Sequence, residues 1–145
     1  MAPDSTGLFF SLAMSHLLQA LEFRRNFGQP NLHPEVSIKA EDVSRLNMQI
    51  GLIQEEGNEF KEAICEWVDA PSNATKSHAL KELADLVYVC FQMAAFLNVD
   101  LDTALDRVHA SNMSKLDENG KPIYSASGKV MKGPGYKEPD LNDLV

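Results

Sequence analysis

The chain has 145 residues, of which 13 are lysine or arginine and 21 are aspartate or glutamate, so its net charge is −8. A chain of this length predicts one domain with its own core, and 44% hydrophobic residues are typical of a folded soluble protein rather than a disordered one. The acidic excess argues against a protein that binds DNA or RNA polymers through a basic surface.

The N-terminal stretch does not have the pattern of a secretory signal. Residues 1–18 contain only a short apolar run, and Asp4 stands where a secretory signal needs positive charge. No stretch reaches the roughly 18 apolar residues of a membrane span. Two cysteines are too few for a disulfide framework. We therefore expect a cytoplasmic protein without a membrane segment, located in the host cytoplasm if the gene is viral.

Two helices are expected in the first half of the chain. The first runs from residue 5 to about residue 25 and ends where Gly28 and Pro30 stop it. The second begins between residues 37 and 41 and continues to about residue 68, where a break at 69–73 contains Pro71. Its apolar residues recur at spacings of three and four, which predicts an amphipathic helix. They are Leu46, Ile50, Ile53, Phe60, Ile64 and Trp67.

The third expected helix, residues 74–97, is apolar on nearly every face. Between Leu83 and Leu97 the only strongly polar side chains are Asp85 and Gln92, which indicates a helix buried on all sides. Three other helices and a tail cover such a helix poorly, so we predict a homodimer or a dimer of dimers. A fourth helix is expected to begin at an N-cap of Asp100 or Asp102 and to end near residue 115.

The last segment, residues 118–145, holds glycines and prolines that forbid a long helix. Residues 123–124 and 130–131 can pair as a short β-ribbon. The predicted fold class is therefore all-α: an antiparallel four-helix bundle core over residues 1–117, followed by an irregular tail over 118–145, all in one domain that assembles as a dimer or tetramer.

The candidate chemistry lies in carboxylates on the second and third helices. Residues three or four apart on a helix face the same way. Glu56 and Glu59 therefore form one pair, with Glu55 and Glu59 as the alternative, and Glu82 and Asp85 form another. The break at 69–73 lets the two helices pack antiparallel with both pairs opposed.

Four or five carboxylates that face one another suit a hard divalent cation such as Mg²⁺, for which Mn²⁺ can substitute. Glutamates on a helix more often lie on a face exposed to solvent than bind a metal ion. Asp85 is harder to explain in that way, because an ionised carboxylate in an apolar helix is unfavourable unless it is paired or bound to metal. Lys81 and Arg107 are the alternative partners, through a salt bridge.

Together these motifs resemble a known family. The E-E-x-x-E motif at residues 55–59, the helix break and E-L-A-D-L-x-Y at residues 82–88 closely resemble the MazG family of all-α nucleotide pyrophosphohydrolases, in its compact phage and bacterial form. Dimeric dUTPases, dCTP pyrophosphatases and phosphoribosyl-ATP pyrophosphatases belong to the same superfamily. The segments 112–116 and 128–136 resemble the phosphate-contacting tail of such proteins.

The resemblance implies hydrolysis of a nucleoside or deoxynucleoside triphosphate to the monophosphate and pyrophosphate, in a homo-oligomer. By position, Glu56, Glu59, Glu82 and Asp85 become the metal ligands. Glu55 orients or deprotonates the attacking water, or helps to hold a further ion. By the same resemblance, the residues that contact phosphate or sugar are Asn112, Lys115, Lys132 and Tyr136.

Two other interpretations of the function remain open at this point. A ferritin-like di-iron bundle also uses inward carboxylates, but it needs Glu-x-x-His pairs where this chain has Glu82 and Asp85. A helical interaction module that binds nucleotide without hydrolysis, or binds no ligand, is the third. The four histidines, at positions 16, 33, 78 and 109, are read as surface or packing residues.

Overall fold

The computed structural model describes residues 14–32 and 37–145. Over these residues the fold is all-α, as predicted, with four α-helices, one short 3₁₀ helix and no strand longer than a single bridge. α1 spans His16–Asn26, and the Ser15 side chain caps it by accepting a hydrogen bond from the amide of Leu18. Residues 5–13 of the expected first helix lie outside the described residues.

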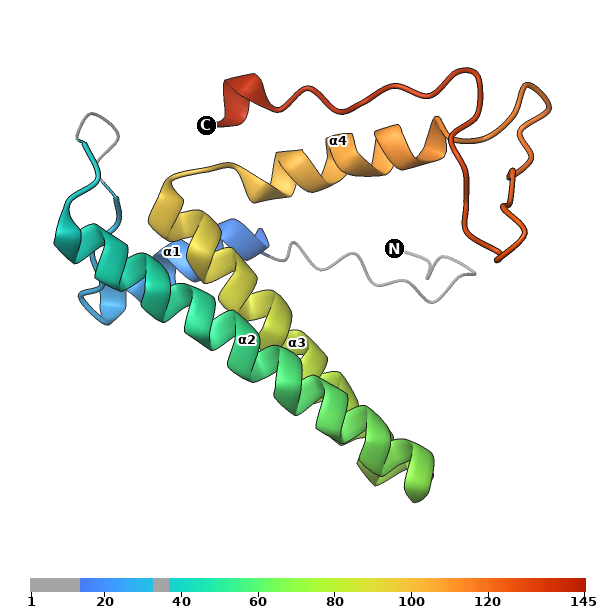
Figure 1. Ribbon diagram of the computed structural model, residues 1–145. Helices are drawn as coiled ribbons and strands as arrows, with labels where there is room; N and C mark the ends of the chain where they lie inside the picture. The colour runs from blue at the N-terminus through green and yellow to red at the C-terminus, as the bar shows by residue number, and fades with distance from the viewer. Residues whose placement is uncertain (1–13, 33–36) are drawn as a thin grey trace, which may run out of the picture.

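α2 (Ala40–Asp69) and α3 (Asn73–Leu97) form a long antiparallel hairpin. Figure 1 shows them side by side along most of their length. The link is short because α3 is capped at once: the Ser72 hydroxyl accepts from the amide of Thr75, and the Thr75 hydroxyl oxygen accepts from the amide of Ser72. This tight turn fixes which residues of the two helices lie opposite each other.

α1 packs across the C-terminal half of α3. Ala20 of α1 is buried against Phe91 and Ala95 of α3. Partly buried Leu17 and Leu21 extend this core, together with a leucine at the start of the next helix. The small alanines let the two helices approach closely, so this end of the hairpin forms the main apolar core of the described residues.

α4 (Leu101–Met113) turns away from the hairpin, at 114° to α3. Asn98 ends α3 in the left-handed conformation, with φ of 57°. Asp100 then caps α4 by accepting from the amide of Thr103, which decides between the two predicted caps. Asp102 instead accepts from the amide of Leu17 on α1, at 3.2 Å. The sharp bend leaves α4 in contact with α1 rather than with α2.

The tail runs back along α4 in the opposite direction (Figure 1). The Ser111 hydroxyl donates to the carbonyl of Lys137, and the amide of Asp100 donates to the carbonyl of Leu144 in the 3₁₀ helix η1 (Asn142–Leu144). The expected β-ribbon shrinks to one antiparallel bridge between Tyr124 and Val130. Tight turns on both sides leave no length for a strand.

Within residues 14–32 and 37–145, the other elements do not cover the apolar third helix on every side. α2 and α1 pack against two of its faces, and α4 bends away from a third. A row of α3 side chains on that open side is exposed, comprising Leu80, Leu83, Val87 and Tyr88. Together with His16 and Gln19 of α1 these residues line an apolar groove of about 330 Å³. The described part of one chain therefore leaves one side of α3 exposed, in agreement with the prediction that three other helices and a tail cover such a helix poorly.

Among the described residues, no helix on its own has the length and apolar character needed to cross a membrane. Only α3 and α4 taken together, as a pair bent at 114°, meet the criteria of length and composition.

Candidate metal centre

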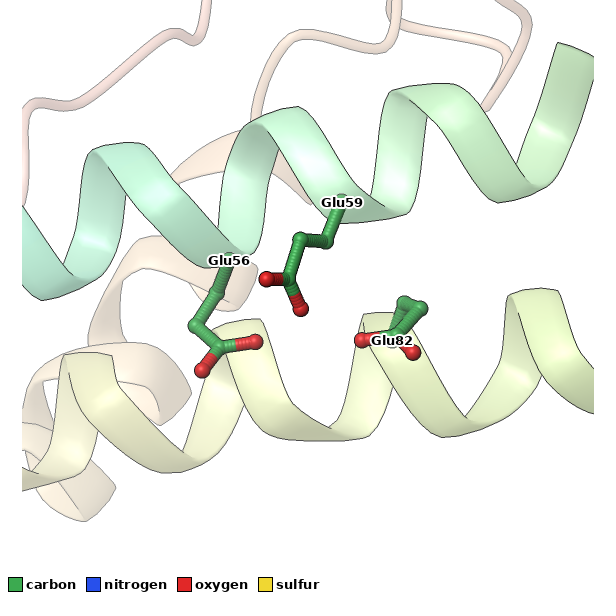
Figure 2. A group of neighbouring side chains, drawn as sticks. All are labelled: Glu56, Glu59 and Glu82. Atoms are coloured by element: carbon green, nitrogen blue, oxygen red, sulfur yellow. The ribbon is translucent and has the colours of Figure 1, made fainter.

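Three carboxylates converge in the middle of the hairpin. Glu56 and Glu59 project from α2 toward α3, and Glu82 of α3 lies opposite them (Figure 2). One carboxylate oxygen from each of the three lies within 4.8 Å of the other two. The i, i+3 spacing places the two α2 glutamates on one face, and the antiparallel hairpin brings Glu82 to the same level.

This cluster is partly withdrawn from solvent. Glu82 is 4% exposed, Glu56 is half-buried and Glu59 is exposed. Oxygen Oε2 of Glu56 and oxygen Oε2 of Glu82 are both buried without a hydrogen-bond partner in the described structure. Burial raises the pKa of Glu56 above its ordinary value, and repulsion from Glu59, Asp85 and Glu82 raises it further.

Unpaired buried carboxylate oxygens are unfavourable unless a hydrogen-bond donor, a water molecule or a cation satisfies them. The donor set consists of oxygens alone, which is the chemistry that Mg²⁺ and Mn²⁺ prefer. The three glutamates therefore fit a divalent metal ion, with the two orphaned oxygens as its natural ligands.

Asp85 lies one turn beyond Glu82 but is held by a neighbour on its own helix. The Lys81 ammonium lies 2.8 Å from Asp85 Oδ2 and 3.1 Å from Glu82 Oε1. The hydrogen bond to Asp85 is the main cause of a raised pKa for Lys81. Of the two alternative partners predicted for Asp85, Lys81 is therefore the one used. Arg107 instead pairs with Asp143 and donates to the carbonyl of Asp140 in the tail.

Glu55, the other predicted catalytic carboxylate, is exposed and lies outside the group of three. One residue corresponds to about 100° around a helix, so Glu55 projects to the side of the face that carries Glu56.

The four predicted phosphate contacts gather elsewhere, at the far end of α4. Lys115 donates to the side-chain carbonyl of Asn112 at 2.7 Å, and the Lys132 ammonium lies 4.4 Å from the centre of the Tyr136 ring. The amide of Gly133 donates to the carbonyl of Lys115 and joins the two pairs. A side chain at position 133 would clash, because a Cβ there would lie 2.6 Å from the carbonyl oxygen of Leu116.

One chain therefore brings the carboxylates together and the phosphate contacts together, but it does not join the two groups. Figure 1 shows α4 leading away from the middle of the hairpin, where the carboxylates lie. The sequence alone did not indicate this separation.

The structure also gives specific contacts to His78, which sequence reasoning assigned to a surface or packing role. Nε2 of His78 lies 3.1 Å from Glu82 Oε1, and Nδ1 lies 2.8 Å from Glu66 Oε2 on α2. The hydrogen bond with Glu66 is the main cause of a raised pKa for His78. His78 also lines a cleft of about 440 Å³, together with Glu59 and Glu82 of the cluster. The i, i+4 spacing from His78 to Glu82 was the available signal.

Comparison with known proteins identifies the family to which this chain belongs. No curated protein matches the chain. The family model described as phosphoribosyl-ATP pyrophosphohydrolase matches residues 20–112, well over half of the chain. The matched range contains all five predicted carboxylates and stops before Lys115 and the tail. This family hydrolyses pyrophosphate bonds of nucleotides. The chain belongs to the phosphoribosyl-ATP pyrophosphohydrolase family.

Proposed function

We propose that this protein hydrolyses nucleoside or deoxynucleoside triphosphates to the monophosphate and pyrophosphate, with Mg²⁺ as its cofactor and Mn²⁺ as a substitute. The observation that carries the proposal is the group of Glu56, Glu59 and Glu82, whose two orphaned oxygens call for a cation. Asp85 becomes a fourth ligand once it leaves Lys81. This arrangement is of the MazG type within the wider family.

The reaction needs water to attack the α-phosphorus. A new P–O bond forms there while the bond to the bridging oxygen breaks, and its electron pair leaves with pyrophosphate. A carboxylate accepts the proton lost by the water, and we assign this role to Glu55 or Glu56. A bound divalent cation neutralises phosphate charge and lowers the pKa of coordinated water.

The phosphates also need cationic and polar contacts, which we assign to Asn112, Lys115, Lys132 and Tyr136. Because one chain holds these residues away from its own carboxylates, we propose that the functional form is a homodimer or dimer of dimers in which a second copy brings the two groups together. The exposed apolar row on α3 supports such an assembly. Neither a nucleic acid polymer nor a membrane is a partner in this proposal, and we place the protein in the cytoplasm.

A substrate panel tests the proposal. The wild-type protein is incubated with Mg²⁺ and each canonical nucleoside and deoxynucleoside triphosphate, and with phosphoribosyl-ATP, and released pyrophosphate is measured. We expect turnover of at least one triphosphate. Loss of a residue that only hydrogen-bonds to a metal ligand typically lowers activity by roughly 10- to 100-fold. Glu82→Gln alters a proposed metal ligand itself, so it should lower the rate of pyrophosphate release by more than that. Binding of a triphosphate with no pyrophosphate release would favour the nucleotide-binding module instead.

A further inference from the structure

His78 links the two helices of the hairpin near the candidate metal centre. It lies on α3 one turn before Glu82, and its ring reaches that residue through Nε2. Its other nitrogen reaches Glu66 on α2, at 2.8 Å. The ring is thus held at both ends, by one carboxylate from each helix.

The contact controls which oxygen of Glu82 is free. His78 and Lys81 both bind Oε1, and Oε2 is left buried without a partner beside Glu56 and Glu59. A carboxylate with one oxygen fixed has a restricted rotation, so its second oxygen is presented in one direction. Glu82 is the most buried of the three glutamates and the only one from α3, which makes its orientation decisive for the geometry of the cluster.

Lys81 contacts Glu82 at the same distance as His78, 3.1 Å, but it does not fix Glu82 relative to α2. Its side chain is 62% exposed, and its ammonium is shared with Asp85. Both of its partners lie on its own helix. The His78 side chain is 49% exposed, and it contacts Glu66 of α2 as well as Glu82 of its own helix, so its ring links the two helices of the hairpin.

We propose that His78 is a positioning residue that aims Glu82 Oε2 at the metal ion, with Glu66 holding the imidazole in place. The inference rests on the proposed function, because it assigns His78 to the same metal centre. His78 itself touches neither metal nor substrate. Its effect passes through Glu82, in the way that second-layer groups orient metal ligands.

The test measures metal affinity directly, by Mn²⁺ titration followed by electron paramagnetic resonance. We expect His78→Ala to weaken Mn²⁺ binding by roughly 10- to 100-fold. His78→Gln keeps an N–H donor of similar reach and should recover most of the affinity. Glu66→Ala leaves the bond to Glu82 in place but frees the ring, so its loss should be smaller than that of His78→Ala.

Lys76→Ala is the matched control. The Lys76 ammonium lies 5.7 Å from the centre of the Trp67 ring and also joins α3 to α2 near the hairpin turn, but it does not touch Glu82. It should lower thermal stability without changing Mn²⁺ affinity. In turnover assays, His78→Ala should regain a near-normal kcat at saturating Mg²⁺, because metal binding rather than chemistry is impaired.

Equal Mn²⁺ affinity in wild type, His78→Ala and Lys76→Ala would overturn the inference and leave the proposed function standing. Loss of affinity in both His78→Ala and His78→Gln, without rescue by the glutamine, would also overturn it. If the wild-type protein binds no Mn²⁺ and releases no pyrophosphate, the proposed function fails and the role of His78 fails with it. Circular dichroism confirms that each variant is folded before titration.

Discussion

The ammonium group of Lys81 lies 2.8 Å from a carboxylate oxygen of Asp85, one turn further along α3. The same ammonium lies 3.1 Å from Glu82. Lys81 therefore occupies the position of a cation between two residues that are proposed metal ligands. A divalent ion that recruits Asp85 must displace this lysine, so the two cations compete for the same carboxylates.

We predict that Lys81→Met strengthens Mn²⁺ binding in the absence of nucleotide. Removing the competing charge frees Asp85, and exposed ion pairs of this kind are weak, so the gain should be about two- to fivefold. Electron paramagnetic resonance titration measures it. Lys129→Met, in the tail, removes the same charge away from the carboxylates and serves as the control. An unchanged or weaker affinity in Lys81→Met alone would contradict the competition.

We predict that Glu56→Gln stabilises the protein in the presence of a chelator. The pKa of Glu56 is raised in the folded state, so folded protein binds a proton more readily than unfolded protein at this site. Stability at this site therefore falls as the pH rises from the ordinary glutamate range through the raised pKa. The wild-type melting temperature should drop more than that of Glu56→Gln between pH 5 and pH 7.

We expect a bound metal ion to reverse this difference in melting temperature between the wild type and Glu56→Gln. Addition of Mg²⁺ should raise the melting temperature of the wild type at pH 7, because the ion binds the folded state alone. The melting temperature of Glu56→Gln should rise much less on addition of Mg²⁺. Equal gains in both proteins would place the bound metal away from Glu56.

We predict that two inactive variants restore activity when mixed. Glu82→Gln damages the carboxylate cluster, and Lys115→Ala damages the proposed phosphate-contacting group, which the chain holds apart from that cluster. If each site draws on two copies, a mixed dimer contains one intact site. With random exchange in a dimer, pyrophosphate release should return to about a quarter of the wild-type rate.

Two controls make the mixing experiment decisive. Each variant alone must stay inactive over the same incubation. A mixture of Glu82→Gln with Glu59→Gln damages the same group in both chains and should show no recovery. If Glu82→Gln and Lys115→Ala show no recovery although subunits exchange, the phosphate contacts do not come from a second copy.

We predict that Leu83→Asp prevents formation of the proposed homo-oligomer. Leu83 is 40% exposed in one chain and lines the apolar groove between α1 and α3. A charge there would be buried without a partner if a second copy covers the groove, which strongly opposes association. Light scattering should show a fall toward 16.1 kDa, the mass of one chain. Val145→Asp adds the same charge at the exposed chain end and should leave the mass unchanged.

The sequence by itself determined the helices of the described residues and the meeting of three of the predicted carboxylates. Helix limits follow from local signals, such as the Ser72 cap and the periodic apolar residues of α2, and these act within a few residues. The meeting of Glu56, Glu59 and Glu82 follows equally from local rules. Their spacing sets the face of each helix, and a tight turn sets the register between the two helices.

Only the tertiary structure decided where the remaining residues lie. The 114° bend after α3 carries Lys115 away from the carboxylates, and this angle depends on how Asp102 and Leu101 meet α1 rather than on a sequence period. The link from His78 to Glu66 joins residues on different helices and depends on side-chain conformations. Spacing along one helix does not encode either relationship, because both arise from packing between elements.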